Sequence, residues 1–350
     1  MNSGPGAPIT AAADRDGSYD EALERLHTTG PEFDGWPSNH GPMVVEVLSR
    51  RGAGARVHAW TDRYAARLDE RPRGLDPLTT QTWPDALGDP RRSGDWLDFL
   101  LTEMGERPWQ DTLGIWWPRL LPGIAAGATH AVIRVGHVVQ ALREEVTAPR
   151  LSELAHALAY WAARWQPVPV TPATGSRQAG AALDGIPGVP DPRGGIRDRL
   201  AQLPDTPGWA AAQAALDPGP DPAATLTAVV DAALAAYAVQ AHGQPTMLVH
   251  AVTAPAAVAR VLPSLSPALA RPSVDAAWAA TAAVFAAYRP RDPRPPIDPG
   301  ALSTDDAWEQ ALAHAGEHVL KLADVALLSS AHSARRTGVS ATLAAISQDA

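Results

Sequence analysis

The segment Thr129–Leu142 reads THAVIRVGHVVQAL. Its apolar residues occupy nearly every face of a helix instead of a single stripe, which is typical of a helix buried at the centre of a helical protein. His130 and His137 are two turns apart on roughly one face, and Arg134 lies four residues after His130 on the same face. We therefore expect a central, buried helix that carries polar groups for which packing gives no reason.

Helical patterns continue on both sides of this segment, whereas the alternation expected of β-strands is almost absent. The patterns occur over residues 19–27, 41–51, 57–68, 95–104, 151–165, 208–216, 223–242, 247–261, 274–288 and 305–334. Two Pro-rich stretches interrupt them: residues 167–195 are expected to form a long loop or lid, and residues 289–300 a connector. The prediction is an all-α fold, with a flexible tail over residues 1–16 and a single large multi-helix domain over residues 17–345.

Composition excludes several classes of function. The formal net charge is -9, which disfavours binding to nucleic acids or anionic membranes. With no cysteine in the chain, thiolate ligands, disulfides and a cysteine nucleophile are excluded. No apolar run approaches the roughly 18 residues of a membrane span, and no signal peptide is evident. We expect a cytoplasmic protein without nucleic-acid or membrane partners, and the sequence gives no oligomeric state.

Lys321 is the single lysine among the 29 basic residues of the chain. The abundance of Ala, Arg and Pro suggests a GC-rich coding sequence, in which lysine drifts to arginine wherever positive charge is all that is needed. Arginine cannot lose its proton, form an imine or add carbon dioxide. Because Lys321 lies in the apolar run VLKLA, it is predicted to be a buried amine with a chemical role.

Four imidazoles occur in apolar or Gly-containing helical segments: His40, His130, His250 and His318. Each one alone is more often a core histidine than a ligand. Burying all four would cost several kcal/mol unless each found a partner, and a shared metal ion would satisfy them together. His318, Lys321 and Asp324 follow one another at i+3 steps on one helix face. These residues predict a histidine-rich metal centre that includes the lysine.

Next to a metal ion, a buried lysine should have a lowered pKa. The neutral amine then has three roles open to it: a Schiff base with a carbonyl substrate, a general base, or a carbamate formed with carbon dioxide. Neutral imidazoles give a divalent ion no charge compensation, and a carbamate on Lys321 would supply it. The carbamate is the favoured hypothesis, and the other two roles stay open.

Four motifs occur in a fixed order along the chain: NHGPM at residues 39–43, GATH at 127–130, HAVT at 250–253 and EHVLKL at 317–322. Together they resemble the questin oxidase-like family over residues 18–335. The resemblance implies an oxygenase of secondary metabolism that opens anthraquinone rings by a Baeyer–Villiger-like or dioxygenase-like step. It also implies a non-haem Fe(II) centre with a modified lysine. The implied ligands are His40, His130, His250, His318 and Lys321.

The chain departs from the fungal pattern at Arg134, where those members tend to carry a second histidine. His137 or His318 would fill that position, and the substrate need not be an anthraquinone. The predicted catalytic residues are Arg134, His137 and Asp324. Arg134 is expected to pair with an anionic substrate or oxygen species, or else with Asp324 or Glu317. His137 is a sixth ligand candidate or a group that orients a ligand.

The expected partners are O2 and a small aromatic substrate of the polyketide or quinone type. Four tryptophans are candidates for the wall of its pocket, although tryptophan is more often simply a core residue: Trp116, Trp117, Trp161 and Trp165. No dinucleotide fingerprint follows a strand, so a requirement for NADPH stays open.

Three other functions compete with this hypothesis. A metal-dependent hydrolase bridged by a carbamylated lysine lacks the H-x-H motif and the strands of the usual barrel. In a second alternative, Lys321 is a Schiff-base or general-base residue of a metal-free enzyme, which borohydride trapping with a carbonyl substrate would discriminate. A non-catalytic helical binding protein would bind no metal and would be indifferent to chelators.

Overall fold

The computed structural model describes residues 17–328 and 332–348. The tail predicted over residues 1–16 lies outside the described residues. Within them the chain forms sixteen α-helices, with isolated β-bridges but no strand, so the predicted all-α class is confirmed.

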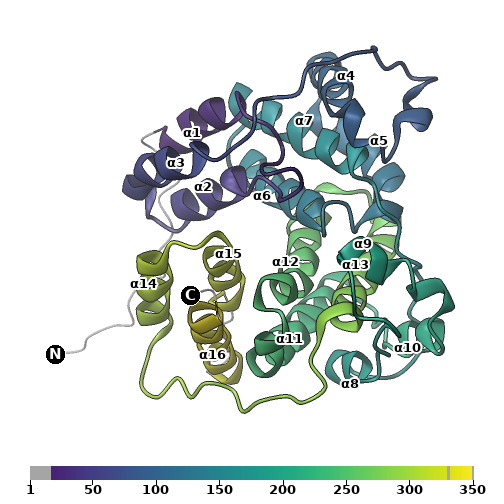
Figure 1. Cartoon of the computed structure of the whole chain (residues 1–350), viewed down its shortest axis with the longest axis vertical. Helices are drawn as coiled ribbons and strands as arrows, with labels where there is room; N and C mark the ends of the chain where they lie inside the picture. Colours follow the sequence, from purple (N-terminus) through teal and green to yellow (C-terminus); the bar gives the residue numbers. More distant parts are fainter. Residues whose placement is uncertain (1–16, 329–331, 349–350) are drawn as a thin grey trace.

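The centre of the fold is α6 (His130–Glu144), in which all but three residues are buried. Three helices pack directly against it: α2 (Gly41–Arg50), α7 (Ala148–Ala163) and α12 (Pro245–Val261). Because α6 is apolar around its circumference, it can accept a neighbour on every side. Figure 1 shows it between the N-terminal helices and the green helices of the second half of the chain.

The remaining helices form three groups around this centre (Figure 1). The first group is α1 (Ser18–Leu26) and α3 (Val57–Ala65), and the second is α4 (Ser93–Glu106) and α5 (Trp109–Leu120). The third is formed by α8 (Ala179–Asp184), α9 (Ile196–Leu200), α10 (Trp209–Ala214), α11 (Pro222–Gln240), α13 (Pro267–Tyr288), α14 (Thr304–His314), α15 (Glu317–Ala326) and α16 (His332–Gln348).

The helical pattern over residues 305–334 proved to be more than one helix. Ala315 adopts a left-handed conformation with φ 60°, which ends α14, and Gly316 is the N-cap of α15. The break redirects the chain so that α15 packs against α2 and α12. The sequence interpretation also missed α5 and did not expect α8 inside the segment 167–195, whereas residues 289–300 contain no helix.

By length and composition, two helices would be able to cross a membrane: Pro222–Gly243 and Pro245–Ser264. The sequence interpretation overlooked them because polar residues interrupt both apolar runs. The second packs against α6, α11, α13 and α15, and 61% of its apolar window is buried. It is the kind of core helix that a soluble helical domain contains.

Candidate metal centre

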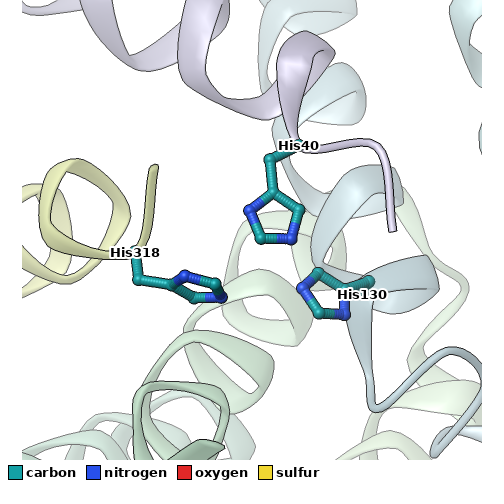
Figure 2. Close-up of side chains that lie close together, drawn as sticks. All are labelled: His40, His130 and His318. Atoms are coloured by element: carbon teal, nitrogen blue, oxygen red, sulfur yellow. The ribbon is translucent and has the colours of Figure 1, made fainter. Parts of the chain in front are cut away.

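Four helices bring their N-terminal turns to one point. His40 is the N-cap residue of α2, and His130 is the first residue of α6. His318 is the second residue of α15, and His250 lies in the second turn of α12. Figure 2 shows the rings of His40, His130 and His318 converging from three different helices. The structure therefore brings together the four histidines that the sequence singled out.

The backbone before His130 has an uncommon conformation. Gly127, Ala128 and Thr129 all have positive φ, at 53°, 56° and 71°. For the two non-glycine residues this conformation costs on the order of 1–3 kcal/mol each. A Cβ at Gly127 would come within 2.4 Å of the Tyr160 hydroxyl oxygen. The carbonyl of Gly127 lies 2.6 Å from Nδ1 of His130, so this turn fixes the orientation of the ring.

The ring nitrogens are close enough to share one ion. Nε2 of His130 lies 3.0 Å from Nε2 of His250. Two nitrogens bound to one metal at about 2.1 Å, with a right angle between them, would be about 3 Å apart. Ligand nitrogens of His40, His130 and His318 all lie within 4.8 Å of one another. The observed spacing therefore fits a single mononuclear site.

Several buried nitrogens in this cluster have no hydrogen-bond partner among the described residues. Among them are Nδ1 of His40, Nε2 of His318 and Nζ of Lys321. The Lys321 side chain is 1% exposed, and its burial lowers the pKa of the amine to about 7. Burial is also the largest cause that lowers the pKa of all four histidines. The four imidazoles are therefore held in their neutral states, which are the states that bind metals, and the lowered pKa of Lys321 makes the neutral amine accessible near neutral pH.

Little negative charge faces this cluster. Among the described residues, the carboxylate that acts on Lys321 is Glu317, which raises the pKa of the amine but does not outweigh the effect of burial. Oε1 of Glu317 is 3.9 Å from Nδ1 of His40, but it also accepts a hydrogen bond from Arg67 at 2.5 Å. Helix N-termini carry partial positive charge. The cluster would therefore favour an added anion.

Arg134 pairs with a carboxylate of the neighbouring helix, and its predicted catalytic role stays a prediction. It donates two hydrogen bonds to Glu153 in α7, at 2.5 and 2.8 Å. His27 lies 2.9 Å from the same carboxylate and stacks on His156 at 4.3 Å. The expected pairing of Arg134 with Asp324 or Glu317 was wrong, because Glu153 in the neighbouring helix takes both donors.

The buried ion pair between Arg134 and Glu153 should make the stability of the protein fall at acidic pH. Arg134 and His27 outweigh burial and hold the pKa of Glu153 at about 2, below its ordinary value of 4.5. A lowered carboxylate pKa stabilises the fold above about pH 4.5, and the contribution is lost as the pH falls towards 2. We expect Glu153→Gln to unfold more easily at pH 7 and to lose less further stability between pH 5 and 2 than the wild type. Urea unfolding at each pH measures this, and parallel pH profiles would contradict it.

His137 and Asp324 lie in a second buried network. Nδ1 of His137 is 2.6 Å from Oε2 of Glu46. Nε2 of His137 is 3.1 Å from Nη1 of Arg260. Asp324 accepts hydrogen bonds from three arginines, Arg50 at 2.6 Å, Arg51 at 2.8 Å and Arg260 at 2.5 Å. Their roles as catalytic groups stay predictions, and the contacts show what each one touches.

The candidate aromatic wall is part of the hydrophobic core. Trp116 and Trp117 are fully buried; the first packs edge-on against Trp96 at 5.5 Å and the second against Trp161 at 5.3 Å. The indole N–H of Trp161 donates to the Gly123 carbonyl. These contacts support the interpretation as core residues.

Sequence reasoning missed three charged residues of the networks: Glu46, Glu153 and Arg260. Each lies in an apolar stretch, MVVEVL, LSELAHAL and AAVARVL respectively. A charge inside a buried helical pattern requires a buried partner. The sequence therefore indicated that each of these charges has a buried partner, but it did not indicate which residue the partner is.

Comparison with known proteins identifies a family. The family model described as questin oxidase-like matches residues 38–325, which include all four histidines, Lys321 and Asp324. No curated protein matches the chain.

Proposed function

This chain belongs to the questin oxidase-like family, which implies an oxidative enzyme, and we propose that it is a non-haem iron oxygenase acting on an aromatic substrate with O2. The proposed ligands are His40, His130, His250, His318 and a carbamylated Lys321. The observation that carries the proposal is the convergence of His40, His130 and His318, with His250 against His130 and the only lysine nearby, and with buried nitrogens that lack partners.

The residues present fit such an ion. Imidazole nitrogens are ordinary ligands for divalent iron. A carbamate would place negative charge where the N-termini of α2, α6 and α15 meet and where Glu317 is already paired with Arg67. Fe(II), when bound, would supply the one-electron chemistry with O2 that side chains cannot perform.

The chain itself would hold and orient the reactants. The Gly127 carbonyl would keep the proton of His130 on Nδ1 and leave Nε2 free to bind. Tyr64 accepts a hydrogen bond from the backbone N–H of His40 at 2.5 Å, which fixes the start of α2. The same partial positive charge that favours a carbamate would favour a phenolate or a hydroquinone anion as the substrate.

The proposal is tested by metal analysis combined with oxygen uptake. Protein produced without added metal should contain about one iron per chain, and a planar hydroquinone should stimulate its consumption of O2. His130→Ala should lose both the iron and the oxygen uptake. Wild-type protein that contains no iron, binds none on addition and unfolds identically with and without iron would contradict the proposal.

Isotope and reductant experiments would then divide the reaction types. A dioxygenase places both atoms of 18O2 in the product without an external reductant. A Baeyer–Villiger-like monooxygenase places one atom in the product, reduces the other to water and consumes two electrons, supplied for example by NADPH.

The metal-free lysine enzyme is the second candidate, because the amine of Lys321 is buried and unpartnered. Borohydride with a carbonyl substrate would trap it as a reduced adduct on Lys321. An adduct in iron-free, catalytically active protein would favour this candidate over the oxygenase.

A further inference from the structure

The four helices that carry the histidines meet a second time, one or more turns further along each helix. α2 contributes Glu46, Arg50 and Arg51, and α6 contributes His137. α12 contributes Arg260, and α15 contributes Asp324. We call these six residues the charged layer. The histidine cluster and the charged layer thus consist of side chains from the same four helices.

Asp324 is the hub of the charged layer. Its side chain is fully buried, and its two oxygens accept hydrogen bonds from Arg50, Arg51 and Arg260. Arg51 also donates to the backbone carbonyl of Asp324. One aspartate therefore joins α15 to both α2 and α12, by its backbone as well as its side chain.

α6 is joined to the same hub by His137. Nη1 of Arg260 contacts the His137 ring while its Nη2 donates to Asp324. On its other side, His137 contacts Glu46, which also accepts a hydrogen bond from Arg50 at 2.6 Å. The network is closed, so removing its hub leaves three buried or half-buried guanidinium groups without their shared partner.

Lys321 is one helical turn from Asp324, and thus lies between the two layers. A rise of 1.5 Å per residue places their Cα atoms about 5 Å apart along α15. The tip of Lys321 is buried without a partner, so nothing but the packing of its helix determines where the amine points. Fixing the turn that contains Asp324 therefore fixes the position of the amine.

We infer that Asp324 is a positioning residue, which locks α15 against α2 and α12 so that Lys321 and His318 are held in the histidine cluster. In its metal-binding part this inference depends on the proposed function. Groups that orient metal ligands typically change metal affinity by about 10–100-fold when removed. Asp324 would act in this way through the helix backbone instead of through a hydrogen bond to a ligand.

The test compares Asp324→Asn with Asp95→Asn. Asp95 is a matched control because it is also a buried aspartate: it binds Arg92 and accepts hydrogen bonds from Leu75 and Asp76, but its helix α4 carries no histidine of the cluster. Arg51→Gln is a milder second variant if Asp324→Asn fails to fold, since Arg51 is partly exposed and contributes one of the three arginines.

Two measurements are made on each variant. The first is the affinity for Co²⁺ and its visible absorption spectrum, which reports ligand geometry. The second is the rate at which acetic anhydride acetylates Lys321 in metal-free protein, read by mass spectrometry; no other lysine side chain exists to interfere.

We expect Asp324→Asn to weaken Co²⁺ binding at least about tenfold, to alter the spectrum and to accelerate acetylation of Lys321 by a similar factor. Asp324→Glu should restore part of each, and Asp95→Asn should change neither, even if its melting temperature falls as far. Equal changes in the Asp324 and Asp95 variants, or none in either, would overturn the inference. If wild-type protein binds no Co²⁺, the proposed metal centre fails and acetylation alone decides the role of Asp324.

Discussion

Lys321→Arg is expected to lose bound iron and oxygenase activity by more than about a hundredfold, since removing residues that merely orient a ligand already costs 10–100-fold. The guanidinium cannot lose its proton, add carbon dioxide or form an imine. It would also be a permanent cation, buried next to four imidazoles and paired with no carboxylate except Glu317. Iron content and oxygen uptake measure the loss.

Because the chain contains one lysine, the carbamate can be observed directly. Protein equilibrated with ¹³C-bicarbonate should show one ¹³C carbamate resonance from a side chain, and Lys321→Arg should lack it. A Lys321→Ala variant leaves space for a small anion, so formate or acetate should restore part of its iron binding. An active Lys321→Arg enzyme would refute the carbamate and the Schiff base alike. If formate restores iron binding to Lys321→Ala but not to Lys321→Arg, the iron was lost because the carboxylate ligand is missing, and not because the variant fails to fold.

Removal of the metal is expected to lower the melting temperature by about 6 °C when iron had been present at a thousandfold excess over its Kd. Binding of that strength stabilises the native state by about 4 kcal/mol, and a chain of this length unfolds with an entropy of about 0.7 kcal/mol per kelvin. Once the ion is gone, the nitrogens of His40, His318 and Lys321 are again buried without partners. Calorimetry before and after dialysis against a chelator measures the shift.

His130→Ala serves as the control for this experiment. Its melting temperature should be the same with and without the chelator, because the variant no longer binds the ion. A wild-type melting temperature that does not respond to chelation, in protein shown to contain iron beforehand, would mean that the ion contributes nothing to folding.

The sequence was sufficient for the helical class and for the members of the candidate centre. Apolar periodicity indicated α6, and the lysine stood out because the other 28 of the 29 Lys and Arg residues are arginine. The ion-pair partner of each buried charge could not be predicted from the sequence. Arg134 had Asp324 and Glu317 as plausible partners on the grounds of sequence, and the fold gave it Glu153 because α7 packs directly on α6.

The break between α14 and α15 shows the same limit at the level of the backbone. Residues 305–334 have a continuous helical pattern, and nothing local requires Ala315 to adopt φ 60°. The turn exists because α15 gains its contacts with α2 and α12 only when the chain reverses there. Long-range packing of this kind overrides local propensity.

The histidine cluster and the charged layer also determine at what stage of folding the candidate centre can form. Arg51 and Asp324 are separated by 273 positions in the sequence, and His40 and Lys321 by a similar span. Contacts between such distant residues form late, because a long loop must close before they contribute any energy. A nascent or truncated polypeptide that lacks α15 would present three histidines but no amine and no hub. Metal capture would therefore mark the completion of folding, and iron would be withheld from any chain that had stopped short of its last helices.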